Sequence, residues 1–163
     1  MVADFYRTFA TVSLTVTGLW MFVAQARFRE WIADRDHVRR ASAVSVQLSF
    51  PGMMSLLALI DPESSLLWRV AFGVTSALAV GLLVALRRRS RGPWARVNNV
   101  ANWIATALFA AIGVVAASPG IADDLGVRGP RQLEFFLFCL LLFNGLLVAW
   151  SMLFAEAQDE PSA

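Results

Sequence analysis

Five long stretches of this chain contain no Asp, Glu, Arg, Lys or His. They are 19, 20, 17, 26 and 21 residues long, at positions 8–26, 41–60, 70–86, 97–122 and 135–155. An α-helix rises 1.5 Å per residue, so about 20 apolar residues are needed to cross a hydrocarbon layer of about 30 Å. The pattern predicts five transmembrane helices, at about 8–26, 41–60, 66–86, 97–117 and 133–155.

The composition agrees with a membrane location. Hydrophobic residues make up 58% of the 163 residues and charged residues 16%, against about 45–50% and 25% in soluble domains. We therefore expect an all-α membrane protein, with residues 1–163 forming a single integral membrane domain built as a five-transmembrane-helix bundle. A formal net charge of +2 is too small to indicate a nucleic-acid partner.

The basic residues predict an orientation. All fourteen are arginines, and ten of them lie in two segments, Arg27–Arg40 and Arg87–Arg96. Positive charge in short loops marks the cytoplasmic side, so the N-terminus is expected outside and the C-terminus in the cytoplasm. We expect a multi-pass protein of a plasma (inner) membrane, and the arginine-only basic set suggests a bacterial source. Both segments are expected to contact anionic lipid headgroups.

The first of these segments, Arg27–Arg40, has the pattern of a short amphipathic helix in the membrane interface after the first span. Phe28, Trp31 and Ile32 fall on one face, and charged residues cover the rest. A competing interpretation of the N-terminus remains open. Residues 1–26 end in Ala24-Gln25-Ala26, which resembles the small-residue cleavage site of a signal peptide.

Small residues recur every four positions in the third span, at Gly73, Ala77, Gly81 and Ala85. This spacing places them on one face of a helix, where they permit close approach of another helix. The stripe predicts helix packing, either within the chain or in a homo-oligomer or larger membrane complex. We expect the third and fourth helices near the bundle centre and the Phe- and Leu-rich fifth helix at its edge.

Polar residues at mid-membrane depth form a first candidate site. Pro51 lacks the amide hydrogen that would bond the carbonyl of Gln47, and Gly52 follows it, so a kink is expected in the second span. Broken helices at this depth build the sites of many transporters, although structural hydrogen bonding is the commoner use of such residues. The candidate residues are Gln47, Pro51, Gly52, Asn144, Thr15 and Thr75.

A second candidate site is an aromatic and amide pocket toward the cytoplasmic side. Its predicted residues are Trp20, Asn98, Asn102, Trp103 and Trp150. The alternative is an interfacial belt of tryptophans facing lipid headgroups.

Missing residue types limit the possible chemistry. The chain has no lysine, one histidine outside every span (His37) and one cysteine (Cys139). We assign no catalytic residue, no metal ligand and no cofactor. The expected function is that of a non-enzymatic accessory or assembly component. The alternatives are an oligomeric channel or transporter for a neutral solute or anion and, with less support, a lipid-modifying membrane enzyme.

Overall fold

Five long helices form the fold in the computed structural model, which describes residues 2–61, 64–86, 95–121 and 130–159. They are α1 (Val2–Ala26), α3 (Arg35–Ile60), α4 (Ser65–Leu86), α5 (Ala95–Ala117) and α7 (Pro130–Asp159). A single turn, α2 (Phe28–Trp31), joins α1 to α3. No strand occurs among the residues described. Each of these five described helices is long and apolar enough to cross a membrane, in agreement with the five long apolar helices expected from the sequence.

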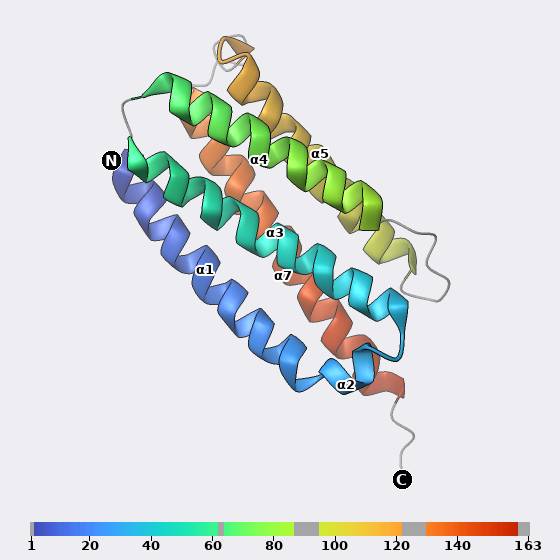
Figure 1. Cartoon of the computed structure of the whole chain (residues 1–163). Helices are drawn as coiled ribbons and strands as arrows, with labels where there is room; N and C mark the ends of the chain where they lie inside the picture. Colours follow the sequence, from blue (N-terminus) through green and yellow to red (C-terminus); the bar gives the residue numbers. More distant parts are fainter. Residues whose placement is uncertain (1, 62–63, 87–94, 122–129, 160–163) are drawn as a thin grey trace.

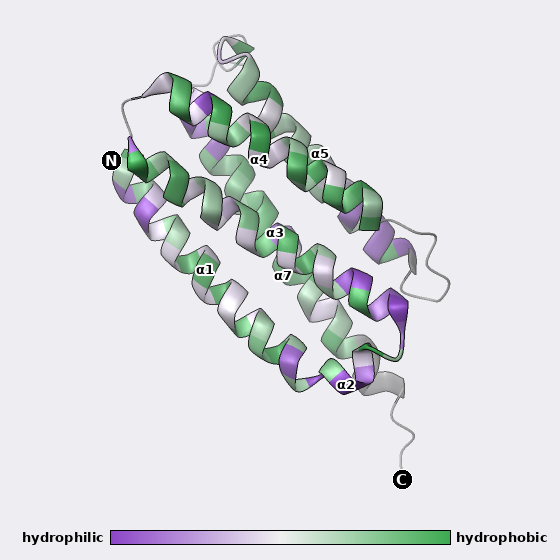
Figure 2. Cartoon of the chain, viewed as in Figure 1, coloured by the Kyte–Doolittle hydropathy of each residue, from purple (hydrophilic) through white to green (hydrophobic). Residues whose placement is uncertain are grey.

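Successive long helices run in opposite directions and pack side by side (Figure 1). The start of α1 and the end of α7 therefore lie at opposite ends of the bundle. We call the end that holds α2 and the start of α3 the arginine-rich end, because Arg27–Arg40 lies there. The other we call the amino-terminal end. Hydrophilic residues (purple) gather at the arginine-rich end in Figure 2, while the middle of the bundle is mostly hydrophobic.

Helix α3 is the central element, because it contacts α1, α4 and α7. In the most apolar 18-residue stretch of α3, 50% of the residues are buried, against 28% in α4, 33% in α5 and 39% in α7. The expectation that the third and fourth spans lie at the centre was wrong, and α7 is not the least buried helix. Residue size predicts poorly which helix is central, because lipid and Leu are equally apolar.

Two clusters of buried hydrophobic side chains fill the interior. The larger joins all five long helices and includes stacked rings, with centroids 3.7 Å apart for Phe5 and Phe135 and 5.6 Å apart for Phe72 and Phe138. The smaller lies toward the arginine-rich end and contains Trp20, with contributions from α2, α3 and α7. Aromatic contacts of this kind add to the packing beyond the area that they bury.

Three glycines carry close approaches between helices. A Cβ atom added at any of them would lie 3.2 Å or less from a side-chain atom of a neighbouring helix. The pairs are Gly52 with Ser13 (2.8 Å to Oγ), Gly145 with Leu48 (2.9 Å to Cδ2) and Gly113 with Ser76 (3.2 Å to Cβ). Gly52 therefore serves the packing of α1 on α3.

The predicted small-residue stripe of α4 does not pack within the chain. Ala77, Gly81 and Ala85 are exposed, and a Cβ atom at Gly73 or Gly81 would meet nothing within 4 Å. Of the two uses predicted for this stripe, packing against another helix of the same chain was therefore wrong. The buried face of α4 instead carries larger residues, including Phe72 and Leu83, which fill the space toward α3 and α5.

Large apolar side chains cover the outside of every long helix. In water such a surface would be a large unfavourable patch, whereas in lipid it is the expected covering. Examples are Leu19 and Phe22 of α1, Met53 and Leu56 of α3, Leu66 and Leu78 of α4, Val100 and Ile104 of α5, and Phe136 and Phe143 of α7.

The segment Arg27–Arg40 differs from the single interfacial helix that we expected. Helix α2 ends after four residues, and α3 begins at Arg35 with Asp34 as its N-cap. Because Asp34 accepts a hydrogen bond from the amide of Asp36, it favours a new helix start within the segment. The second half of the segment is therefore the first turn and a half of α3.

Candidate functional site

The buried amides of Gln47 and Asn144 meet where α3, α5 and α7 come together. Asn144 Nδ2 donates to Gln47 Oε1 over 2.7 Å and to the carbonyl oxygen of Ala101 over 3.0 Å. Gln47 is 1% exposed and Asn144 8% exposed. The two residues that the sequence singled out at mid-depth thus form one junction, which we call the amide junction (Gln47, Asn144 and the Ala101 carbonyl).

The other residues of the predicted mid-membrane site do not join the amide junction. Thr15 is exposed on α1, and Thr75 donates to the carbonyl of Ala71 in its own helix over 2.6 Å. Helix α3 continues through Pro51 without ending, so the unwound segment typical of transporter sites is absent from α3. The Oγ of Ser13 donates to the carbonyl of Leu48, so α1 supplies a hydrogen bond close to the proline.

The predicted inner pocket is not assembled as expected. Trp103 is 50% exposed and Trp150 64% exposed on the outside of the bundle, where Trp150 packs against Phe154. These two tryptophans fit the alternative that we left open, a belt facing lipid. Of the three tryptophans predicted to line this pocket, Trp20 alone is buried, and its ring lies 5.7 Å from that of Trp31.

Trp20 instead fastens α1 to α3. Its indole nitrogen donates to Ser45 Oγ over 3.1 Å and to the carbonyl of Ala41 over 3.4 Å. A tryptophan that buries its ring and satisfies its N–H in this way has a structural use.

Asn98 and Asn102 lie one turn apart on α5, and Asn102 contacts the neighbouring helix α4. Asn102 Nδ2 donates to the carbonyl of Leu83 over 3.3 Å. The Oδ1 atoms of both asparagines are buried without a hydrogen-bond partner among the described residues. Asn102 therefore belongs to the α4–α5 contact, apart from Trp20, Trp103 and Trp150.

A third buried polar junction, at the amino-terminal end, was missed by the sequence analysis. Glu134 of α7 is 0% exposed and accepts hydrogen bonds from Trp68 Nε1 over 2.9 Å and from Tyr6 Oη over 3.3 Å. Three helices are thereby joined by one carboxyl group. Its second oxygen, Oε1, has no hydrogen-bond partner in the part of the chain that the structure describes. A buried carboxyl is retained only where donors offset its desolvation.

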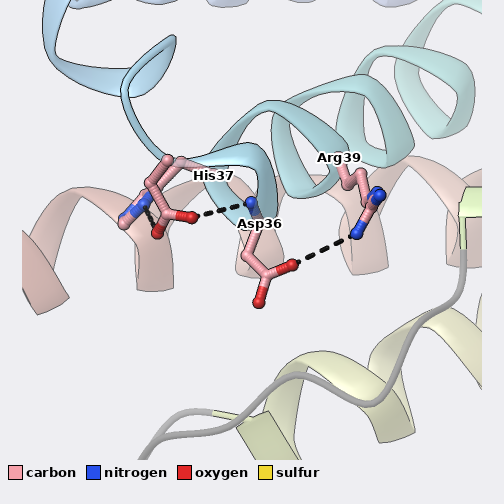
Figure 3. A network of polar contacts seen from close by, with 4 residues as sticks. Asp36, His37 and Arg39 are labelled. Carbon is pink, nitrogen blue, oxygen red and sulfur yellow. Dashed lines mark hydrogen bonds and ion pairs between the residues drawn. The ribbon is translucent and has the colours of Figure 1, made fainter.

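Local polar contacts join Asp34, Asp36, His37 and Arg39 at the start of α3 (Figure 3). Asp34 Oδ2 lies 2.7 Å from His37 Nδ1, and Arg39 donates to Asp36 Oδ1 over 3.4 Å. The amide of Asp36, followed by the His37 ring, holds the pKa of Asp34 below its usual value. Of the second arginine segment, Arg87–Arg96, residues 87–94 lie outside the described residues, and Arg96 is exposed.

The polar groups of these junctions form hydrogen bonds between helices. Within the described ranges, no three His, Cys, Asp or Glu side chains gather in a group that could hold a metal ion. The side-chain amides of Gln47, Asn144 and Asn102 and the carboxyl of Glu134 each link two or three helices. The sequence gives little indication of the Glu134 junction. An acidic residue at a helix end is usually solvated, and the two hydrogen-bond donors to Glu134 lie 66 and 128 residues away in the chain.

We compared the chain with known proteins. No protein-family model, no curated protein and no solved structure matches the chain significantly.

Proposed function

We propose that this chain is a small integral membrane protein without enzymatic activity that assembles with another membrane-embedded polypeptide. The partner is a second copy of the chain or a different protein. The contact is made through the outward small-residue face of α4, formed by Gly73, Ala77, Gly81 and Ala85.

This proposal is supported by the small-residue face of α4, which has open space in front of it. A Cβ atom at Gly73 or Gly81 meets nothing within 4 Å, whereas the glycines that pack inside the bundle are others. In lipid, helices associate through close van der Waals contact, because hydrophobicity does not distinguish a helix from a lipid tail. A small-residue face that is not used inside the chain is available to a helix outside it.

The experiment compares two leucine substitutions on open helix faces. Gly81→Leu adds a bulky side chain to the proposed contact, and Gly18→Leu adds the same side chain to α1, where a Cβ atom also meets nothing within 4 Å. Both changes raise helix propensity by about 0.8–1 kcal/mol, so folding is retained. We expect Gly81→Leu to reduce the assembled mass in detergent, measured by light scattering, and Gly18→Leu to leave it unchanged. A native chain that runs as a monomer and co-purifies with nothing would contradict the proposal.

An oligomeric channel or transporter is the second candidate, and the amide junction favours it. Polar side chains at mid-depth are costly in lipid and commonly mark pathways. Passage of a neutral solute or an anion would require Asn144 to release Gln47. Flux in liposomes that is lost in Asn144→Leu, with folding intact, would support this function, and absence of flux in the native protein would remove it.

A further inference from the structure

A groove opens between α2 and the first turns of α3 at the arginine-rich end. Its volume is about 160 Å³, and its walls include Phe28, Trp31 and Ile32 from the α2 side and Val38, Ala41 and Ser42 from α3. Phe28, Ile32 and Val38 are exposed large hydrophobic residues, although they lie within a highly charged segment. Neither the assembly face of α4 nor the amide junction uses this groove.

Both serine hydroxyls of the groove already donate to backbone carbonyls. Ser42 Oγ donates to the carbonyl of Val38 over 2.9 Å, and Ser45 Oγ donates to the carbonyl of Ala41 over 2.9 Å. The groove therefore offers an apolar surface to a ligand. An apolar cavity of about 150 Å³ holds a benzene molecule, so this groove accommodates a hydrocarbon segment of about six carbons.

The charges around the groove are unbalanced. All three acidic residues of the segment contact basic neighbours: Glu30 lies 3.1 Å from Arg27, Asp36 lies 3.4 Å from Arg39, and Asp34 lies 2.7 Å from His37.

Arg29 and Arg35 are exposed and have no ion-pair partner among the residues described. In sequence, Arg29 stands between the groove residues Phe28 and Trp31, and Arg35 stands between Ile32 and Val38. Two positive charges thus lie in the two short segments that form the groove.

We infer that this groove binds one acyl chain of an anionic phospholipid, whose phosphate is held by Arg29 and Arg35. An apolar groove flanked by surplus positive charge matches the two parts of such a lipid. The position of the groove, at the charged end of a bundle with an apolar exterior, places it where headgroup and acyl chain meet. This inference does not rest on the proposed assembly role.

Native mass spectrometry of the full chain in detergent measures the binding directly. Phosphatidylglycerol and phosphatidylcholine with identical acyl chains are titrated separately. A basic residue near an anionic lipid contributes about fivefold in affinity, so we expect one tightly held phosphatidylglycerol and an overall preference of about 25-fold. Equal binding of the two lipids would overturn the inference.

Two pairs of variants locate the site. Arg29→Gln with Arg35→Gln should reduce the preference to near one, while Arg7→Gln, which removes an exposed arginine at the opposite end, should not change it. Ser42→Phe fills the groove and should abolish the tight adduct.

Thr11→Phe is the matched control for the filled groove, because Thr11, like Ser42, donates only to the carbonyl four residues before it. Retention of the adduct in Ser42→Phe, or the same loss in Thr11→Phe, would contradict the site. Cross-linking of Phe28 to a second chain would assign the groove to a protein partner and would also overturn the proposal.

Discussion

Asn144 of α7 donates its amide hydrogen to the side-chain oxygen of Gln47 of α3 over 2.7 Å, in the interior of the bundle. The same nitrogen donates to the Ala101 carbonyl of α5. One asparagine therefore binds together the central helix and two of its neighbours.

Replacing Asn144 by Leu should destabilise the fold by about 1–3 kcal/mol, because the buried Oε1 of Gln47 loses its donor. Adding Gln47→Leu should recover part of this loss, since removing both partners of a buried hydrogen bond is nearly neutral. Unfolding free energies in detergent for the two single variants and the double variant measure the coupling. Strictly additive effects would show that the two amides do not interact.

Gly52→Ala should loosen α1 from α3. The new Cβ would lie 2.8 Å from Ser13 Oγ and 3.1 Å from Ser13 Cβ, and overpacking of this kind costs about 1–3 kcal/mol. The midpoint of thermal unfolding, followed by circular dichroism, should fall. Gly18→Ala is the control and should raise or preserve the midpoint, because nothing lies within 4 Å of a Cβ at Gly18. A Gly52→Ala protein as stable as the control would refute the close approach.

Two substitutions of Glu134 test whether its role is to accept hydrogen bonds or to carry charge. Glu134→Gln keeps an oxygen for Tyr6 and Trp68, so unfolding stability should be retained. Glu134→Leu leaves two buried donors unpaired and should cost about 1–3 kcal/mol for each. Thermal unfolding of both variants in the same detergent compares them. If Glu134→Gln were as damaging as Glu134→Leu, the negative charge itself would be required.

Asp34 predicts a pH dependence at the start of α3. Its pKa is lowered in the folded chain by the amide of Asp36 and by His37, so its stabilising effect is complete above the unfolded pKa of about 3.9. The effect is lost as the pH falls through the lower folded pKa. Asp34→Ala should therefore reduce stability at pH 7 by about 0.5–2 kcal/mol, and the difference should become smaller in strong acid, where the Asp34 carboxyl is neutral.

Asp34→Asn is the control for this titration. Asparagine caps helices about as well as aspartate but does not ionise, so its stability should lack the acid-dependent step. Unfolding midpoints measured from pH 2 to pH 7 distinguish the three proteins. An equal acid-dependent step in Asp34→Asn would assign the titration to another group.

The five long apolar helices could be predicted from the sequence because the cost of placing a charge in lipid acts on each residue locally. Charge-free stretches therefore mark the helices directly, and four of the five predicted ends at the C-terminal side of a span agree with the helix ends Ala26, Ile60, Leu86 and Ala117. The sequence also placed Gln47 and Asn144 in one candidate site, because both were expected near the middle of the membrane.

Helix rotation could not be predicted in the same way. Whether Gly81 faces a neighbour or the outside depends on how α4 turns about its axis, and apolar surfaces give no preference between protein and lipid. The Glu134 junction was missed for a related reason. Its donors come from two other helices, so nothing local to Glu134 in the sequence shows that it is buried.

The most direct test of the whole account is the location of the two chain ends. Five crossings would place them on opposite sides of the membrane, and the start of α1 and the end of α7 lie at opposite ends of the bundle in Figure 1. With Cys139 replaced by Ser, single cysteines at Ala3→Cys or appended after residue 163 are treated with a membrane-impermeant maleimide in intact cells. We predict labelling at Ala3→Cys and labelling of the appended cysteine only after permeabilisation. Labelling of both from the same side would contradict a five-helix membrane protein.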